Sequence, residues 1–508
     1  MDFGGGTLDC ESTCQGDADC GSGCCIMLTD GRHACAPADM CGRIAVGGAC
    51  SVNNDCLGGP QGDTSCVNFG GSVGALCEDY CQSGSDCGTG CCTDLTNGQR
   101  ACAPTDQCQG ATFPDPTEVG HNPVVLEDPQ GTLHLLETAD EVNTYPVRYG
   151  ECAGDCRDAA NWSFITLGNH GLYGGFAHLA LDPSGHPRVL YLQEGSGTHF
   201  IYATCDAGCT NAANWTSTTA ATGDDLTSIG ASYTPYFAID HQGRPAFFYQ
   251  TYDATYYASC QSNCTQSSSW SSLALNLSNS GLGDFDLTFT SSGAPRVLFR
   301  QWNQISGCNT GDALGFLACD ADCSSAAANW HTTLFYCTSA AGRLQLNASD
   351  QPRIVFYDHE SDALPYLTYG WCDGNCTTAS SWSSRSLGLG AGSGTSADLA
   401  LDAQSRPIVA YEVANDPYAL GIASCSAGCE TSSGSWSSRD VETSASLAAE
   451  TPPYVPSGCD AAYWYPGTDP SIALRASGAI GVAYDVTSLE TCSGQVQNGP
   501  ALVRLGVF

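Results

Sequence analysis

One hydrophobic pattern recurs seven times between residues 124 and 484. Each copy alternates apolar and polar positions, passes through a short turn that usually contains Asp or Asn and Gly, and then alternates again. Alternation with a period of two is typical of a half-buried β-strand, and Asn, Asp and Gly favour tight turns. Each copy therefore predicts a β-hairpin. The seven copies are residues 124–136, 179–191, 237–249, 287–299, 344–356, 399–411 and 472–484.

A second motif follows six of the seven hairpins. It is a further apolar strand that ends in C-x3-C, with Trp ten or eleven residues after the first Cys. The hairpin and this second unit together predict four strands in each repeat. The six motifs are Cys152/Cys156 with Trp162, Cys205/Cys209 with Trp215, Cys260/Cys264 with Trp270, Cys319/Cys323 with Trp330, Cys372/Cys376 with Trp382, and Cys425/Cys429 with Trp436.

Four strands in each repeat of about 55 residues, with no helical periodicity between them, predict an all-β fold of the β-propeller type. The seven hairpins indicate seven blades over residues 111–508, whereas the Trp motif alone would indicate six. The seventh hairpin has no Trp motif after it. We expect residues 501–508 (ALVRLGVF) to form its third strand, and the segment near 111–119 to supply the missing outer strand and close the ring.

The segment 1–110 has a different organisation and predicts a separate disulfide-rich domain. Seventeen of the 33 cysteines lie there, and the seven-cysteine spacing of residues 10–41 recurs without change at 77–108, with a short cysteine unit at 50–66 between the copies. So few large hydrophobic residues indicate a knottin-type framework held by cross-links. The alternative is zinc binding, but the one nearby histidine, His33, is absent from the second copy, where Arg100 takes its place.

Cysteine parity adds an expectation about Cys10. Residues 14–41 and 81–108 each contain a set of six cysteines, and Cys50, Cys56, Cys66 and Cys77 form a set of four. We therefore predict that Cys10 is unpaired and available for an intermolecular disulfide. The alternative is that Cys10 pairs within the module and another cysteine is left free.

The cysteines after residue 110 have a structural and a metal-binding interpretation. Six similar C-x3-C placements, one in each repeat, favour disulfides at the outer hairpin turns over six separate thiolate sites. The remaining four are expected to pair as Cys308 with Cys337 and Cys459 with Cys492.

Composition narrows the function classes. There are 53 acidic residues and 16 basic ones, all of them Arg, for a net charge of −37. Such a chain lacks the clustered cations that bind nucleic acid. Schiff-base and P-loop chemistry are excluded as well, because both need a lysine side chain. No apolar run is long enough for a membrane span. The cysteine content indicates an oxidising compartment, so we expect an exported protein, extracellular or at the cell surface, whose signal peptide was removed before Met1.

The hairpin repeats resemble the L-A-L-D-x2-G-x-P-x-V-x-Y repeats of secreted β-propellers in bacterial surface proteins, including those of myxobacteria. The copies at 179–191 and 399–411 carry the likeness most clearly, and the resemblance covers about 390 residues. It implies a fold more than a function, because propellers serve as lectins, hydrolases, lyases and scaffolds alike.

One column of the repeat differs from copy to copy. It lies four residues before the turn-starting residue, at the start of the inner strand, and reads Val124, His178, Tyr236, Asp286, Arg343, Asp398 and Ser471. We expect these side chains at one mouth of the central channel. The ends of the second strands are expected at the same face and offer Gln250, Arg300, Tyr357, Glu412 and Asp485. We predict ligand binding by His178, Tyr236, Asp286, Arg300, Arg343, Asp398, Glu412 and Asp485; the alternative is that solvated positions hold polar residues without any ligand.

No residue set identifies a resident cofactor. The acids Asp224 and Asp225 and the run Asp358-His359-Glu360 would suit calcium, although no twelve-residue calcium loop is present. Aromatic residues in predicted loops are candidates for stacking on a sugar or a protein partner, the alternative being packing between blades. They are Tyr252, Tyr256, Tyr257, Trp302, Trp464 and Tyr465.

Two functions fit these observations. The first is a secreted or cell-surface binding and scaffold protein that holds a glycan or protein partner at the channel mouth, because no nucleophile elbow, HExxH or Ser-His-Asp grouping can be identified. The alternative is a carbohydrate-active or other hydrolytic enzyme or lyase. In that case Asp286 or Asp398 would be the acid or base, Arg343 or Arg300 would orient the substrate, and Tyr236 or His178 would assist.

Overall fold

The computed structural model divides the chain into two compact units, one formed mainly by Met1–Gly110 and the other by Ala111–Ala476 with Ile480–Gly506. Before residue 104 it describes six strands. From there on it describes residues 110–114, 120–139, 146–170, 176–194, 198–223, 236–251, 254–275, 277, 282–302, 308, 311–338, 342–358, 366–389, 396–414, 418–431, 433–476 and 478–508.

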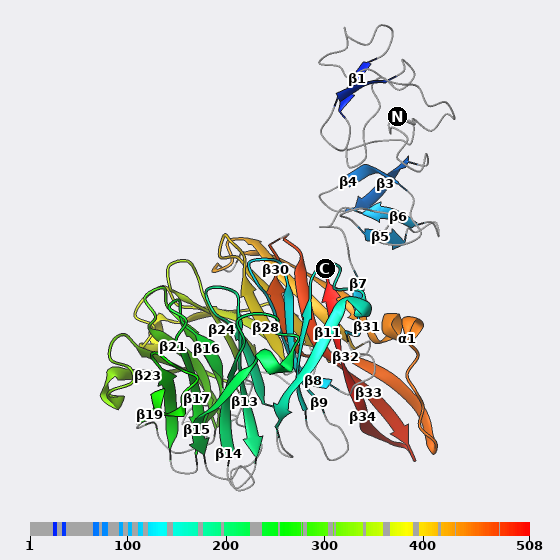
Figure 1. The fold of residues 1–508 in the computed structure, drawn as a ribbon. Coiled ribbons are helices and arrows are strands. Elements are labelled where there is room, and N and C mark those ends of the chain that lie inside the picture. The colour runs from blue at the N-terminus through cyan, green and yellow to red at the C-terminus, as the bar shows by residue number, and fades with distance from the viewer. Residues whose placement is uncertain are drawn as a thin grey trace. The chain divides into compact units, whose positions relative to one another are not determined.

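Seven four-stranded antiparallel sheets form a seven-bladed β-propeller, which confirms the fold predicted from the repeats. Each blade's inner strand contacts the inner strand of the next blade, and the last inner strand contacts the first, so the sheets close a ring (Figure 1). From inner to outer strand, blade 1 consists of β8 (Gly120–Glu127), β9 (Leu133–Ala139), β10 (Pro146–Cys152) and β11 (Trp162–Asn169). Blade 2 consists of β12 (Ala177–Leu181), β13 (Pro187–Glu194), β14 (Thr198–Thr204) and β15 (Thr216–Gly223). Blade 3 consists of β16 (Phe237–Ile239), β17 (Pro245–Gln250), β18 (Thr255–Cys260) and β19 (Trp270–Leu275).

The later blades follow the same order. Blade 4 consists of β20 (Leu282–Phe289), β21 (Pro295–Gln301), β22 (Ala313–Cys319) and β23 (Trp330–Cys337). Blade 5 consists of β24 (Gly342–Leu346), β25 (Pro352–Asp358), β26 (Tyr366–Trp371) and β27 (Ser383–Ser386). Blade 6 consists of β28 (Ala397–Leu401), β29 (Pro407–Val413), β30 (Ala419–Ala427) and β31 (Ser435–Thr443). A short helix, α1 (Ser444–Glu450), follows blade 6.

Blade 7 is built from both ends of the propeller segment. It consists of β32 (Cys459–Leu474), β33 (Ile480–Cys492) and β34 (Gln495–Val507), and its outer strand is β7 (Gly110–Thr112) from the start of the segment. Blades 7 and 1 are joined further by the Ser471 hydroxyl, which accepts the backbone N–H of Val125 at 3.1 Å, and by an ion pair between Arg475 and Glu127 at 2.9 Å. The expected closure by an outer strand near residue 111 is thus present.

The inner hairpin turns owe their shape to one side chain each. In five blades the Asp or Asn that begins the turn accepts backbone N–H groups two and four residues further along, at 2.8–3.0 Å. Asn and Asp favour such turns because their short polar side chains replace a backbone acceptor. The five residues are Asp128, Asp182, Asp240, Asn347 and Asp402.

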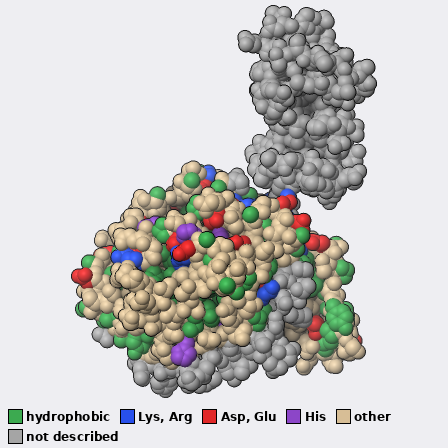
Figure 2. Space-filling model, in the orientation of Figure 1, with side chains coloured by type: hydrophobic (Ala, Val, Ile, Leu, Met, Phe, Trp, Pro, Cys, Tyr) green, Lys and Arg blue, Asp and Glu red, His purple; other side chains and the backbone are tan. Residues whose placement is uncertain are grey.

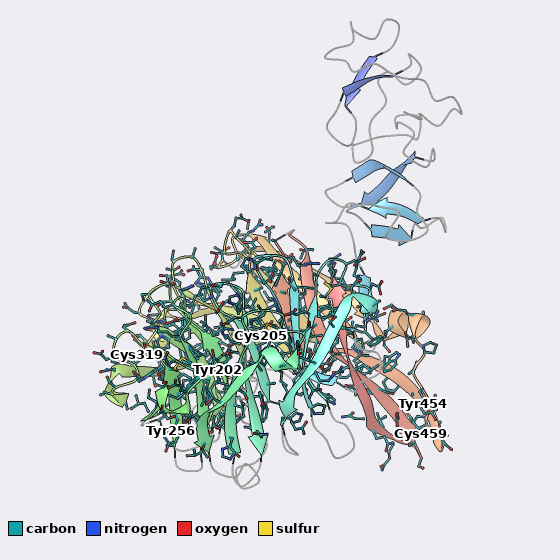
Figure 3. All side chains as sticks on the ribbon, viewed as in Figure 1. Tyr202, Cys205, Tyr256, Cys319, Tyr454 and Cys459 are labelled. Carbon is teal, nitrogen blue, oxygen red and sulfur yellow. A yellow bond between two sulfur atoms is a disulfide. The ribbon has the colours of Figure 1, made fainter. Side chains whose placement is uncertain are left out.

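The cysteines after residue 110 are all paired among themselves. Each C-x3-C pair forms a disulfide where the third strand leads to the fourth, and the pairs are Cys152–Cys156, Cys205–Cys209, Cys260–Cys264, Cys319–Cys323, Cys372–Cys376 and Cys425–Cys429. Two longer links join Cys308 to Cys337 and Cys459 to Cys492, as expected from the sequence. Figure 3 labels Cys205, Cys319 and Cys459.

The Trp of each motif connects its disulfide to the preceding blade. Five of these indoles donate their N–H to the carbonyl of the second Cys at 2.8–2.9 Å: Trp162, Trp215, Trp270, Trp330 and Trp382. A ring from the third strand of the preceding blade packs on the indole, with centroids 4.9–5.3 Å apart, in the pairs Tyr149–Trp215, Tyr202–Trp270, Tyr257–Trp330, Phe316–Trp382 and Tyr369–Trp436. Aromatic packing of the indole therefore holds neighbouring blades together. Short 3₁₀ helices precede five of the Trp residues, at Ala159–Asn161, Ala212–Asn214, Ser267–Ser269, Ala327–Asn329 and Ala379–Ser381.

The first unit contains three described hairpins. They are β1 (Cys24–Met27) with β2 (His33–Ala36), β3 (Thr64–Gly70) with β4 (Gly74–Asp79), and β5 (Cys91–Asp94) with β6 (Arg100–Ala103). The first and third have the same register, because Cys24 faces Ala36 as Cys91 faces Ala103. Disulfide pairing in this unit and the state of Cys10 lie outside the described residues, so both stay predictions. No helix among the described residues is long and apolar enough to cross a membrane.

Candidate functional site

Side chains of the variable column meet at the start of the inner strands. The Arg343 guanidinium donates to the Tyr236 hydroxyl at 2.6 Å and lies over that ring at 5.3 Å, and its Nε is 4.0 Å from a carboxylate oxygen of Asp398. The ring of His178 is 4.8 Å from that of Tyr236. Residues from blades 2, 3, 5 and 6 are thus in contact. Together with Asp286 of blade 4 we call them the channel cluster: His178, Tyr236, Asp286, Arg343 and Asp398.

The two carboxylates of the channel cluster bind backbone groups of the next inner strand. Asp286 accepts the N–H of Leu344 at 2.6 Å, and Asp398 accepts the N–H of Ile472 at 2.8 Å and that of Leu399 at 2.9 Å. Asp286 and Asp398 are therefore bonded within the protein, and ligand binding by the column stays a prediction. Each carboxylate satisfies an edge N–H that a closed ring of separate sheets would otherwise leave without a partner.

Burial governs the ionisation of the channel cluster. It raises the pKa of Asp286 to about 7, against the opposing effect of Arg343, and it raises the pKa of Asp398. Burial and the nearby Arg343 charge lower the pKa of His178 to about 3. At neutral pH the histidine is therefore uncharged, and Arg343 carries the positive charge of the channel cluster.

The second-strand residues enter contacts of their own. Arg300 pairs with Asp284 and Asp312 at 3.2 Å each. Glu412 accepts the hydroxyl of Tyr465 and, at 3.3 Å, the backbone N–H of Ser396. These two charged groups are already partnered, so a ligand would have to compete with the protein for them.

Asp485 lies beside the first blade. Its carboxylate accepts the N–H of Asn122 at 3.3 Å and is 3.6 Å from the ring of His121. Burial raises the pKa of Asp485 to about 7, and the charge of Asp469 contributes to the rise. Of the other second-strand ends, the Tyr357 hydroxyl donates to the carbonyl of Glu412 at 2.6 Å and is fully buried.

Sequence reasoning missed three residues beside the column. Asn122, Asp284 and Asp469 each lie two positions before it, and each has a positive φ where the register of its inner strand shifts. Asn and Asp tolerate this left-handed conformation better than most residues, so their placement is a detectable signal for a bulge. The bulges bring extra carboxylates into reach, and the Asp469 side chain accepts the Ser396 hydroxyl at 3.2 Å.

The aromatic residues expected in exposed loops are engaged in packing. Tyr257 and Trp464 are buried, and Tyr256 stacks on Tyr249 with centroids 5.0 Å apart. Trp302 lies under the guanidinium of Arg300, while the ring of Tyr465 meets that of Tyr418. Tyr252 lies outside the described residues. Packing between and within blades is therefore the role that the described contacts give to these side chains.

Among the described residues, two groups of side chains come close enough to share a metal ion, and in one of them Cys459 and Cys492 form a disulfide and so offer no thiolate. Asp182, His186 and Asp206 come close enough to share an ion, but Arg188 already pairs with Asp182 at 2.5 Å and with Asp206 at 2.7 Å. A guanidinium in that place supplies the charge that a cation would bring. The calcium candidates Asp224, Asp225, His359 and Glu360 lie outside the described residues, and calcium binding there stays a prediction.

The comparisons concern the fold alone. No family model matches the chain, and no curated protein does. Solved structures with similar arrangements include a protein of unknown function from Dyadobacter fermentans (9% identity, 78% of this chain, 97% of that chain, TM-score 0.42), the NanB sialidase of Streptococcus pneumoniae (13%, 77%, 69%, 0.40) and the intramolecular trans-sialidase of Ruminococcus gnavus (12%, 77%, 94%, 0.38). At such low identities and TM-scores these structures carry no argument about activity. The strand pairing defines the protein as a disulfide-rich seven-bladed β-propeller.

Proposed function

We propose that this protein is an extracellular or cell-surface binding protein that holds a neutral glycan at the channel cluster. The observation that carries the proposal is the contact of Arg343 with Tyr236 and Asp398, which joins three blades at one channel mouth. A guanidinium, a phenol, an imidazole and carboxylates at one place can donate to and accept from the hydroxyl groups of a sugar.

Charge favours a neutral ligand over an anionic one. Asp286 and Asp398 both act electrostatically on Arg343, so the single cation of the channel cluster is already balanced. The chain as a whole carries a net charge of −37, and Figure 2 shows acidic side chains at several places on the visible face of the propeller, with basic ones between them. An anion would meet unfavourable potential before reaching Arg343.

The partners of the carboxylates favour binding over catalysis. Both oxygens of Asp398 accept backbone N–H groups, and Asp286 accepts a third at 2.6 Å. A carboxylate held in this way has few lone pairs left for a nucleophilic attack or for activation of water. Export, which the disulfides and the resemblance to bacterial surface propellers support, fits such a binding role.

A glycan hydrolase is the second candidate, and one observation favours it. Burial raises the pKa of Asp286 to about 7, which suits a general acid at neutral pH. In this version Asp286 would protonate the leaving oxygen of the glycan, while Arg343 and Tyr236 would hold the sugar.

Both candidate functions require a glycan to bind at the channel cluster, and a glycan array tests this shared requirement. The wild-type protein, Arg343→Gln and Arg406→Gln are applied to the same array; Arg406, which pairs with Asp402 at 2.6 Å in the turn of blade 6, is the matched control. Arg343→Gln should lose at least about tenfold in binding, the loss typical of one strong polar contact, and Arg406→Gln should not. Equal binding by all three would remove the channel cluster as the site.

Turnover decides between the two candidates. The bound glycans are incubated with the wild type and with Asp286→Asn, which keeps an acceptor for Leu344 but cannot donate a proton as an acid. Intact glycan with both proteins is the result expected for a binding protein. Cleavage by the wild type that Asp286→Asn abolishes, with binding retained, would establish the enzyme instead.

A further inference from the structure

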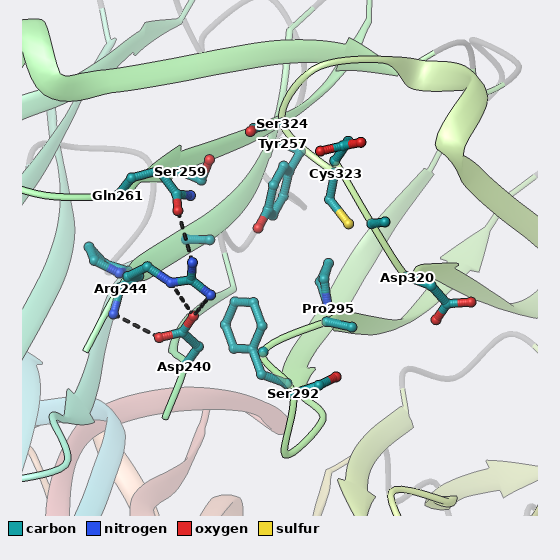
Figure 4. A pocket seen from close by; sticks show the side chains of 17 residues that line it. Asp240, Arg244, Tyr257, Ser259, Gln261, Ser292, Pro295, Asp320, Cys323 and Ser324 are labelled. Carbon is teal, nitrogen blue, oxygen red and sulfur yellow. Dashed lines mark hydrogen bonds and ion pairs between the residues drawn. The ribbon is translucent and has the colours of Figure 1, made fainter. Parts of the chain in front are cut away.

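A cavity of about 300 Å³ lies between blades 3 and 4 at the turn end of the strands (Figure 4). The inner strands run from the channel cluster to the hairpin turns, so this cavity is at the opposite end of the blades. Blade 3 contributes the side chains around Arg244 and Tyr257, and blade 4 contributes Phe289 and the segment 320–324.

Beside the cavity, blade 3 lacks an arginine that blades 2 and 4 on either side have. In blades 2, 4 and 5 the residue after the proline that begins the second strand is Arg, and its guanidinium pairs with the Asp that follows the first Cys of the disulfide. The pairs are Arg188–Asp206 at 2.7 Å, Arg296–Asp320 at 2.6 Å and Arg353–Asp373 at 2.9 Å. Blade 3 has Ala246 and Gln261 at these two positions, and both line the cavity.

One polar group in the wall of the cavity has no hydrogen-bond partner among the described residues. The Ser259 side chain is 3% exposed, and its hydroxyl has no hydrogen-bond partner among the described residues. Ser259 lies opposite Ala246 in the strand pairing, on the side where the arginine is missing. A buried hydroxyl without a partner costs about 1–3 kcal/mol, so its presence in a cavity points to a ligand that would satisfy it.

The remaining lining is amphipathic. Arg244 is fixed by Asp240 at 2.6 Å and by the side-chain oxygen of Gln261 at 3.0 Å, as the dashed lines in Figure 4 show. The rings of Tyr257 and Phe289 supply apolar surface. The cavity therefore offers a hydroxyl, a guanidinium, an amide and carboxylates beside two aromatic side chains.

We propose that this cavity binds a single neutral sugar residue, as a second glycan site at the end of the propeller opposite the channel cluster. The cavity volume is at the lower end of the range of small-molecule sites, which limits the occupant to about one ring. Asp240 already neutralises Arg244, so an anion has no free cation to bind. A sugar has hydroxyl groups for Ser259 and Gln261 and apolar ring faces for the aromatic side chains.

The test fills the cavity with the Arg–Asp ion pair that blades 2, 4 and 5 already contain. Soluble methyl glycosides of glucose, galactose, mannose, fucose and N-acetylglucosamine are titrated into the whole protein, with methylammonium and sulfate as charged probes, and binding is followed by calorimetry. The variant Ala246→Arg with Gln261→Asp rebuilds in blade 3 the pair found in blades 2, 4 and 5. The matched control, Ile408→Arg with Ser426→Asp, makes the same change at the equivalent positions of blade 6, away from the cavity.

At least one glycoside should bind the wild type and the blade 6 control equally, and the blade 3 variant should lose this binding by tenfold or more while melting like the control. Arg343→Gln should keep it, which separates this site from the proposed channel site. Binding that survives in the blade 3 variant, or binding of methylammonium or sulfate alone, would overturn the proposal. The absence of binding by any glycoside would overturn it as well.

Discussion

The two ends of the propeller blades differ in how they vary around the ring. At the turn end the same devices recur from blade to blade: an Asp or Asn turn, a C-x3-C disulfide and a Trp that packs on the preceding blade. At the other end each blade places a different residue in the column that contains Tyr236, Arg343 and Asp398. The repeated residues stabilise a closed ring of similar sheets, so they are the same in most blades. The residues of the variable column are not needed in each blade for this purpose, so they can differ to suit a ligand.

The comparison also separates two kinds of polar residue at the variable end. Asp398 and Asp286 hold backbone groups of the next blade, so they serve the ring itself. Arg343, Tyr236 and His178 contact one another and have no such backbone partner among the hydrogen bonds described for these three side chains. The first pair should therefore respond to substitution mainly in stability, and the other three mainly in binding.

The largest effect is expected for Asp398→Ala. It leaves the N–H groups of Ile472 and Leu399 without their acceptor and removes the carboxylate beside Arg343. We expect a loss of about 2–4 kcal/mol in the free energy of unfolding, since two buried donors lose their partner. Urea denaturation with the disulfides intact measures it.

Asp398→Asn is the matched control for this change, because its amide oxygen still accepts one of the two N–H groups. Its loss should be smaller than that of Asp398→Ala. If the two variants were equally stable, Asp398 would not hold the ring, and the distinction drawn above would be lost.

An intermediate effect is expected from pH at Asp286. The carboxyl has its ordinary pKa of 3.8 in the unfolded chain, and burial raises that pKa to about 7 in the fold. Between these values the fold retains a proton that the unfolded chain releases. The contribution of Asp286 to stability is therefore complete below about pH 4 and is lost as the pH rises towards 7.

Asp286→Asn removes this titration and leaves every other group in place. The melting temperature of the variant relative to the wild type should be higher at about pH 8 than at about pH 5. His178 titrates in both proteins and cancels in the comparison. A difference that does not change with pH would show that Asp286 is ionised in the fold at both values.

The smallest effect is expected at the turn end, where Trp215→Phe and Trp436→Phe can be compared. Trp215 donates its indole N–H to Cys209 at 2.8 Å, whereas the indole N–H of Trp436 has no partner among the described residues. Trp215→Phe should cost about 1 kcal/mol more than Trp436→Phe, the value of one hydrogen bond. Equal losses would assign the motif to ring packing alone.

Much of the fold was predictable because the sequence repeats one strand and turn pattern in each blade. Seven hairpins gave seven blades, and the repeat without a Trp motif indicated an outer strand from near residue 111, which is β7. The C-x3-C spacing indicated the disulfides for the same reason, since one local pattern occurs in each blade. Alternation and turn chemistry act locally, so a single sequence carries them.

The candidate site was predictable only in part, because its contacts join different blades. The column placed Tyr236 and Arg343 at one end, but their contact spans 107 residues of sequence, and the backbone acceptor role of Asp398 depends on β32. Tyr257 was expected in an exposed loop and is buried, because the Trp330 of the next blade covers it. Ala246, where two neighbouring blades have an arginine, lines the cavity, and this difference is visible only when the blades are aligned residue by residue.

The most direct test of the account is a crystal structure of the protein with the glycan that the array selects. The account predicts electron density for the sugar at the channel mouth, with a hydroxyl group within hydrogen-bond distance of the Arg343 guanidinium or the Tyr236 hydroxyl. Density for the bound glycan only elsewhere on the protein, with the contact between Arg343 and Tyr236 unchanged and no sugar beside it, would contradict the claim that the channel cluster is the binding site.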